Sequence, residues 1–246
     1  MSGLTKMTLN EIRLFLREPV AVFFGVLFPS LLVVILGSVP AFRVPNKDIG
    51  GLRVVDLYVP ISIALALALL ALTALPSYLG AYREKGILRR LAVTPMPPAR
   101  LLLAQLLTNL LMAIVSVALL LVVARIIFDV ALPRQIIGYT VAFLLAAAAL
   151  FAMGLFVAAI APSGRSAPSI GMLLYFPIMF FAGLYVPRAV MPPSLQRIGD
   201  FTPLGAGVQA LQDAMIGLWP QPLHLAVMAA YVIVFGVAAA RLFRWE

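Results

Sequence analysis

The most informative reactive groups of this chain form a charged run at positions 83–90, between two long apolar segments. The charged residues of this run lie beside an apolar strip. They are Arg83, Glu84, Lys85, Arg89 and Arg90. That strip is formed by Ile87, Leu88 and Leu91. Such side chains bind a partner through ion pairs and through insertion into an apolar groove. The pattern predicts an amphipathic helix at a membrane surface, where a soluble partner can push.

A second polar group lies inside an apolar segment. Its members are Gln105, Thr108, Asn109 and Ser116. Spacings of three, four, and seven or eight residues place them on one stripe of a helix. The stripe either lines a substrate path or forms hydrogen bonds to a neighbouring helix. Such bonds contribute only about 0.6 kcal/mol each in membranes. A role in helix packing is therefore a simpler explanation of the stripe than a substrate path.

Two kinds of chemistry are missing from the sequence. No glycine loop ends in Gly-Lys-Ser or Gly-Lys-Thr, so we expect no nucleotide hydrolysis by this chain itself. Its single histidine, His224, has no cluster of Cys or carboxylate residues around it, so we expect no metal site. We interpret His224 as an interfacial residue.

Ionisable residues avoid the centres of the apolar segments, which disfavours an ion-coupled carrier. The ionisable residues closest to the apolar segments lie at the predicted ends of the spans. They are Glu18, Asp56, Arg125, Asp129 and Arg241. The energy for any transport must therefore come from outside this polypeptide.

The composition places these groups in a membrane protein. Hydrophobic residues make up 63% and charged residues 11% of 246 residues, with a mean hydropathy of +1.09. Six runs are long enough to cross a bilayer as helices. They are 20–42, 57–81, 101–123, 136–160, 168–186 and 222–242. None alternates polar with apolar residues as a barrel strand does, so the expected fold is all-α with six transmembrane helices.

The charge distribution predicts the orientation. The net charge is +9, but the basic residues lie between the spans rather than on one polar domain, so we expect no nucleic acid partner. With the amino terminus inside, inner segments hold eleven of the 18 Lys and Arg residues and outer segments hold seven. This excess predicts that both termini are cytoplasmic.

The segments outside the spans also show helical patterns. Residues 1–19 have apolar positions at helical spacing before Pro19, which favours an interfacial helix over a basic leader that only sets orientation. In 187–221, Pro192-Pro193 opens a stretch containing Leu195. Thr202 can cap a helix that begins at Pro203 and continues past Leu204 and Leu211. We expect two short re-entrant helices on the outer face, with a surface loop as the alternative.

Three segments together resemble the permease subunits of type-two ATP-binding-cassette exporters, the group that includes daunorubicin-resistance-type drug efflux and polysaccharide export. The segments are the leader ending in Arg17-Glu18-Pro19, the 83–91 run with Thr94-Pro95, and Gly183-Leu184-Tyr185-Val186-Pro187 with the following 191–196 block. The resemblance covers nearly the whole chain.

The resemblance implies a division of labour. The chain, 1–246, would be a single transmembrane domain of the bacterial cytoplasmic membrane, pairing with an identical or paralogous permease and two separate ATPase subunits that use ATP and magnesium. Residues 1–19 would be a connecting helix and 82–95 the cytoplasmic coupling helix, seated in the ATPase through the 83–91 residues, Gly86 included. The 187–221 helices would form the outer gate, with Pro192, Leu195, Pro203, Leu204 and Leu211 as its residues.

Three hypotheses remain for the function. The first is the permease of an exporter whose cargo is an amphiphilic drug or a lipid-like molecule, because the outer loops are short; export of lipid-linked polysaccharide is its close alternative. The second is a membrane anchor or assembly factor without a transport path. The third, an ion-coupled carrier, is disfavoured by the uncharged spans. Binding of an ATPase subunit distinguishes the first from the others.

Overall fold

The computed structural model describes residues 3–49, 51–87 and 99–242. Every regular element within these ranges is a helix, which confirms the predicted all-α class. In chain order they are α1 (Gly3–Leu16), α2 (Pro19–Val22), η1 (Phe23–Leu27), α3 (Phe28–Ser38), η2 (Pro40–Arg43), η3 (Lys47–Ile49), α4 (Val54–Ala68), η4 (Leu69–Ala74), α5 (Leu75–Glu84), α7 (Ala99–Phe128), α8 (Ile136–Ile160), α9 (Ser166–Phe181), η5 (Arg188–Val190), α10 (Pro193–Asp200), α11 (Pro203–Ile216) and α12 (Pro222–Leu242).

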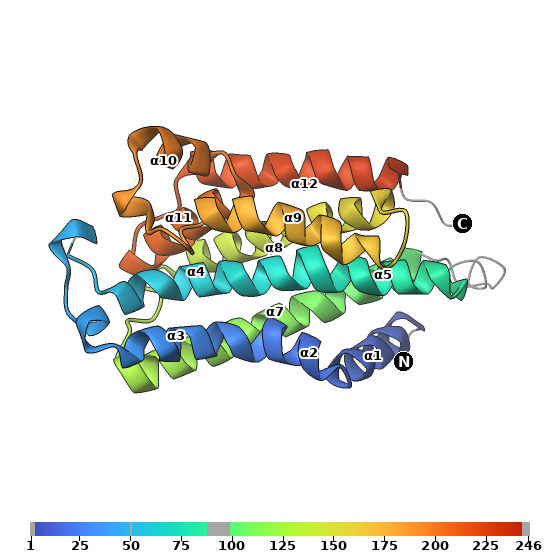
Figure 1. Ribbon diagram of the computed structural model, residues 1–246, viewed down its shortest axis with the longest axis horizontal. Coiled ribbons are helices and arrows are strands. Elements are labelled where there is room, and N and C mark those ends of the chain that lie inside the picture. Colours follow the sequence, from blue (N-terminus) through green and yellow to red (C-terminus); the bar gives the residue numbers. More distant parts are fainter. Residues whose placement is uncertain (1–2, 50, 88–98, 243–246) are drawn as a thin grey trace.

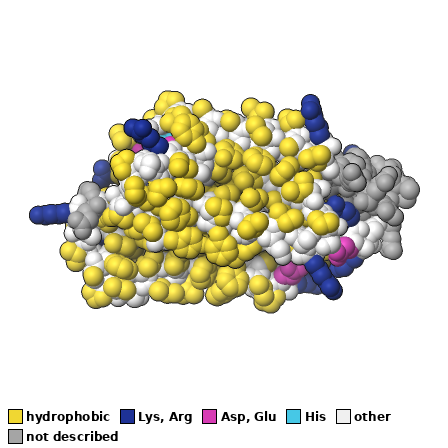
Figure 2. Space-filling view, turned by 45° about the horizontal axis from the view of Figure 1, so that its top comes forward, with side chains coloured by type: hydrophobic (Ala, Val, Ile, Leu, Met, Phe, Trp, Pro, Cys, Tyr) yellow, Lys and Arg dark blue, Asp and Glu magenta, His cyan; other side chains and the backbone are white. Residues whose placement is uncertain are grey.

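The long helices lie side by side along one direction (Figure 1). One end of the bundle contains α1, the end of α5 and the turn between α8 and α9; we call it the α1 end. The opposite end, which we call the α11 end, contains α10, α11 and the loop between α3 and α4. In Figure 2, hydrophobic side chains cover the middle of the visible face, while charged side chains lie toward the two ends. This distribution suits a bundle that crosses a membrane.

Five helices or continuous helical runs are long and apolar enough to span a bilayer. They are Pro19–Ser38, Val54–Glu84, Arg100–Phe128, Ile136–Ile160 and Pro222–Leu242. Each overlaps a predicted span, and the last two have the predicted bounds. The remaining predicted span corresponds to α9, which has 16 residues. At 1.5 Å per residue α9 is roughly 24 Å long, less than a core of about 30 Å, so six spans remain a prediction.

Two spans contain a π-helical stretch, and both stretches end two residues before a proline. η1 ends at Leu27 before Pro29, and η4 ends at Ala74 before Pro76. Proline lacks an N–H, and its ring clashes with the carbonyl four residues earlier. A wider turn relieves that clash. In η4, the N–H of Leu75 accordingly bonds to the carbonyl five residues back.

The wide turn of η4 contacts its neighbours through glycines. A β-carbon at Gly154 of α8 would overlap with the carbonyl oxygen of Ala71, and one at Gly171 of α9 would overlap with that of Leu72. Neither oxygen receives its usual donor, because the N–H of Leu75 bonds elsewhere and Pro76 has none. The α4–η4–α5 span therefore packs closely against both α8 and α9.

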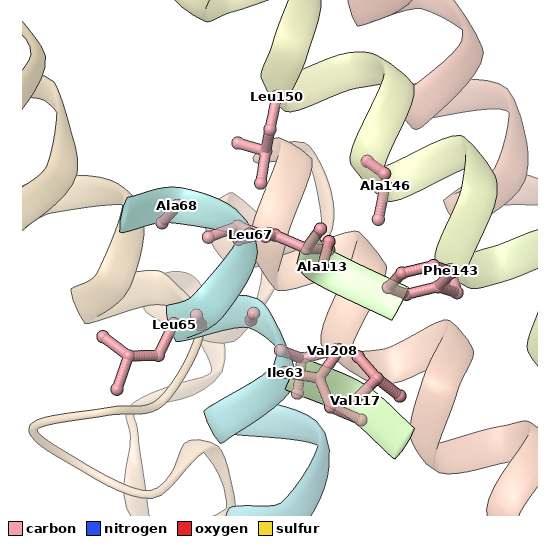
Figure 3. Packing of buried hydrophobic residues seen from close by; sticks show 14 of the residues in the cluster. Ile63, Leu65, Leu67, Ala68, Ala113, Val117, Phe143, Ala146, Leu150 and Val208 are labelled. Carbon is pink, nitrogen blue, oxygen red and sulfur yellow. The ribbon is translucent and has the colours of Figure 1, made fainter. Parts of the chain in front are cut away.

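Side chains from four of the helices meet in the middle of the buried core. Figure 3 shows residues of α4, α7, α8 and α11 converging, among them Ile63, Val117, Leu150 and Val208. Most of α4 is buried, including Val59 and Leu67 at no measurable exposure. The second span is thus the central helix of the bundle, and its packing fixes the position of both of its ends.

Candidate functional site

The predicted coupling segment begins as the last turn of α5. Arg83 and Glu84 are part of this helix, which ends where Gly86 adopts a φ of +65°. This left-handed conformation, which glycine adopts without a steric penalty, breaks the predicted helix 82–95 after Glu84. Lys85 is exposed at the break. Leu88, Arg89, Arg90 and Leu91 lie outside the described residues.

Arg83 contacts the carboxyl end of α8. Its Nη2 donates to the carbonyl oxygens of Ala158 at 2.7 Å and Ala161 at 3.1 Å. In a continuing helix the oxygen of Ala158 would accept from the residue four positions later, but that residue is Pro162, which has no N–H. Arg83 supplies the missing donor, and its positive charge complements the negative end of the helix dipole.

Glu84 contacts the turn that leads into α9. Its Oε1 accepts a hydrogen bond of 2.8 Å from the backbone N–H of Gly164. The side chain is exposed. The sequence had suggested that Glu84 pairs with a cation of a partner; its contact within the chain is to Gly164, and the partner contact remains a prediction.

A buried carboxylate joins α1 to the same region. Glu11 is 5% exposed, and its Oε2 accepts hydrogen bonds from Tyr82 of α5 at 2.7 Å and from Gln105 of α7. Burial raises the pKa of Glu11, and the hydrogen bond from Tyr82 opposes this rise. Sequence reasoning missed this cluster because Glu11 lies among the polar positions of an amphipathic pattern.

A second tyrosine–glutamate pair lies one turn away. Tyr78 of α5 donates to Oε2 of Glu18 at 2.9 Å. Tyr78 and Tyr82 are four residues apart and share one face of α5. A helix, α1, is present within the predicted interfacial segment 1–19, and its place in the membrane interface stays a prediction. The two hydrogen bonds join the segment 11–18 to the second span.

The predicted polar stripe lies inside the chain. Gln105, Thr108, Asn109 and Ser116 are each at most 2% exposed. Gln105 bonds to Glu11, Nδ2 of Asn109 donates to the Gln105 carbonyl at 2.9 Å, and Ser116 donates to the Val26 carbonyl at 3.3 Å. These are contacts between and within helices. A role of the stripe in a substrate path remains a prediction.

Two short helices, α10 and α11, lie at the α11 end where the outer pair is predicted, and their re-entrant position on the outer face stays a prediction. Oγ1 of Thr202 accepts from the N–H of Gly205 at 3.1 Å, Pro203 is the first helical residue, and Gly217 ends α11 at a φ of +96°. Of the predicted gate residues, Pro203, Leu204 and Leu211 are buried, Leu195 is half-buried and Pro192 is exposed. The structure leaves their gating role untested.

His224, which the sequence analysis interprets as an interfacial residue, is buried among protein side chains. It is 3% exposed, and its Nε2 lies 3.1 Å from Oδ1 of Asp200 in α10, to which Arg188 also donates. The ring therefore holds the start of α12 against α10. Within the described part of the chain, no group of three or more His, Cys, Asp or Glu side chains is placed to hold a metal ion.

Two cavities of similar size lie at opposite ends of the bundle. One, of about 350 Å³, is lined by the start of α4, the loop after α7 and α11, with Arg53, Asp56, Asp129 and Asp213 among its walls. The other, of about 370 Å³, lies between the first and second spans and α9. Both π-helical stretches line this second cavity, through Phe24 and Gly25 of η1 and through Leu69, Leu70, Thr73 and Ala74 of η4.

A comparison with protein families gives a match over most of the chain. The family model for ABC-2 type transporters matches residues 4–216, from α1 through α11. A comparison with curated proteins found no match. This membrane domain is a transport permease that generally works with ATPase subunits and is not itself the ATPase. The chain belongs to the ABC-2 type transporter family.

Proposed function

We propose that this chain is the membrane-spanning permease of an ATP-driven exporter of amphiphilic or lipid-like molecules, pairing with a second permease and two ATPase subunits. The observation that supports it best is the position of the coupling segment. It continues directly from α5, whose last turn contacts α8, α9 and, through Tyr82, α1. A displacement of this segment would therefore act on four helices, namely α5, α8, α9 and α1.

The orientation follows from the same arrangement. The described part of the basic run, which includes Arg83 and Lys85, lies at the α1 end, so we assign that end to the cytoplasm and the α11 end to the outside. Both termini are then cytoplasmic, and the protein is placed in a bacterial cytoplasmic membrane. ATP and magnesium bind to the partner ATPase subunits.

The cavity beside the π-helical stretches favours an amphiphilic cargo. Its walls are mainly apolar, including Phe24, Leu70 and Met172, and its polar groups belong to Glu18, Thr73, Ser77 and Tyr78. A volume of about 370 Å³ lies within the range of small-molecule sites. An apolar body with a polar group at one end matches such a lining.

The test is ATP hydrolysis in lipid nanodiscs that contain this chain together with a co-expressed nucleotide-binding subunit. Daunorubicin serves as the amphiphilic probe. We expect the subunit to co-purify and its hydrolysis to rise with daunorubicin or with a fluorescent phospholipid. The matched variant Met172→Asp places a second carboxylate in the cavity and should abolish stimulation while leaving ATPase binding intact. Failure of every candidate subunit to bind would contradict the proposal and favour a membrane anchor.

A further inference from the structure

We propose that Arg83 and Glu84 form a clamp that makes the α8–α9 turn, residues 161–165, move with the coupling segment, so that the ATPase drives α9 as well as α5. This inference rests on the proposed function. It assigns to the two residues a positioning role within the permease, in place of direct contact with the ATPase.

The clamp matches charge to helix ends on both sides of the turn. The guanidinium of Arg83 contacts the carbonyl end of α8, where partial negative charge accumulates. The carboxylate of Glu84 contacts the N–H of Gly164, two residues before α9 begins, where partial positive charge accumulates. Two adjacent residues of opposite charge thus hold two successive helices, and exchanging their charges would make both contacts repulsive.

Hydrogen bonds within the turn join it to the start of α9. Ser163 and Ser166 bond reciprocally: the N–H of Ser163 donates to Oγ of Ser166 at 3.0 Å, and the N–H of Ser166 donates to Oγ of Ser163 at 3.2 Å. The N–H of Ala167 also donates to the Ser163 carbonyl at 3.2 Å. These bonds cap the start of α9 in the manner of a capping box. Whatever moves Gly164 therefore moves the first turn of α9.

Backbone contact prevents slippage between α5 and the turn. A β-carbon at Gly80 would lie 2.5 Å from Cα of Gly164, and one at Gly164 would lie 2.9 Å from the carbonyl carbon of Gly80. Farther along the same interface, the carbonyl of Leu72 contacts Gly171 of α9. The second span thus touches α9 or its preceding turn at two separated points, Leu72 of η4 and Gly80 of α5, and the clamp closes the end nearest the coupling segment.

The first test measures amide hydrogen exchange on the permease alone in nanodiscs. In the Arg83→Gln/Glu84→Gln double variant, we expect the backbone amides of residues 163–167 to exchange about tenfold faster, since hydrogen bonds to charged groups are worth about that factor. Arg83→Lys retains a charged donor and should restore part of the protection. Arg100→Gln is the matched control, because it removes an exposed positive charge from the start of α7. Unchanged exchange in the double variant would overturn the clamp.

The second test follows the turn during nucleotide binding. The chain has no cysteine, so Arg165→Cys, at an exposed position in the turn, accepts a single environment-sensitive dye. With the ATPase bound, Mg-ATP and vanadate should change the dye signal in the otherwise wild-type complex. The change should fall at least about fivefold in the double variant, while the ATPase still co-purifies and hydrolyses ATP.

The two tests separate the possible failures. A full dye response in the double variant would overturn transmission through the clamp even if exchange is faster. If no ATPase binds the wild-type chain, the proposed function fails, and exchange on the permease alone still decides whether the clamp holds the turn.

Discussion

Tyr82 donates its hydroxyl proton to Oε2 of Glu11 at 2.7 Å, which joins the second span to a helix 71 positions earlier in the chain. Gln105 of α7 bonds to the same oxygen. Three helices therefore meet at one buried carboxylate at the α1 end. The position of α1 depends on this group, because α1 contributes few other large buried side chains, chiefly Phe15.

The docking of α1 should depend on pH through Glu11. Burial raises the pKa of Glu11 above its ordinary value of 4.5, so the docked helix binds the proton more tightly than the undocked one. The stabilisation of docked α1 by proton binding at Glu11 is fully present below pH 4.5, the ordinary pKa of the group. It is lost as the pH rises through the raised pKa that Glu11 has in the docked state. Glu11→Gln removes the ionisation, so exchange protection of α1 amides at pH 7 should equal or exceed that of wild type.

The control for this prediction is Glu18→Gln, which removes the same charge at the exposed pair with Tyr78. It should leave the pH dependence of α1 protection in place. Protection in Glu11→Gln that still falls with rising pH would show that another group is responsible.

The members of the polar stripe should differ in their effect on stability. Gln105→Leu leaves Glu11 with one donor fewer in a buried site and should destabilise the protein by roughly 1–3 kcal/mol. Ser116→Ala loses a single bond to a carbonyl within the membrane and should cost about 0.6 kcal/mol. Thermal unfolding in nanodiscs measures both. Equal effects, or a change in stimulation by different cargo molecules, would favour a role in the substrate path.

A methyl group at Gly171 should not be tolerated. A β-carbon there would overlap with the carbonyl oxygen of Leu72, so Gly171→Ala must separate α9 from η4 and should cost about 1–3 kcal/mol or more. Gly236→Ala in α12 is the matched control, because nothing lies within 4 Å of the added carbon. It should stabilise the protein by about 0.5–1 kcal/mol through helix propensity. The two melting temperatures should therefore shift in opposite directions.

The first turn of α11 should depend on its capping residue. Thr202→Ala removes the acceptor for the N–H of Gly205 and should destabilise the protein by about 1 kcal/mol. Thr202→Ser keeps the hydroxyl and should behave like wild type. Exchange at Gly205 measures the effect locally, and equal exchange in the two variants would exclude capping by this side chain.

Local patterns in the sequence predicted the features that depend on local chemistry. The bounds of 136–160 and 222–242 follow from where apolar residues stop, and α11 follows from Thr202, Pro203 and Gly217. Each of these signals acts within a few residues of its effect. They therefore need no knowledge of the tertiary fold.

The contacts of the candidate site could not be predicted in the same way. Glu11 and Arg83 have ordinary positions in amphipathic or charged runs, and only packing shows which neighbours they meet. One signal was available for Arg83, because Pro162 leaves the carbonyl of Ala158 without a helical donor. The break at Gly86 could not be predicted either, because only the folded backbone shows the positive φ that ends α5 there.

The π-helical stretch η4 also sets the rotational phase of the second span. Its wide turn contains one residue more than an α-helical turn would, and each residue of an α-helix turns the chain by about 100°. If all six residues of 69–74 closed into regular α-helical turns, everything after them would therefore rotate by roughly that angle relative to α4. Tyr78, Tyr82 and Arg83 would then face away from Glu18, Glu11 and Ala158, although no residue of the interface had been replaced. The interface thus depends on the shape of a distant turn as well as on the identity of its own residues.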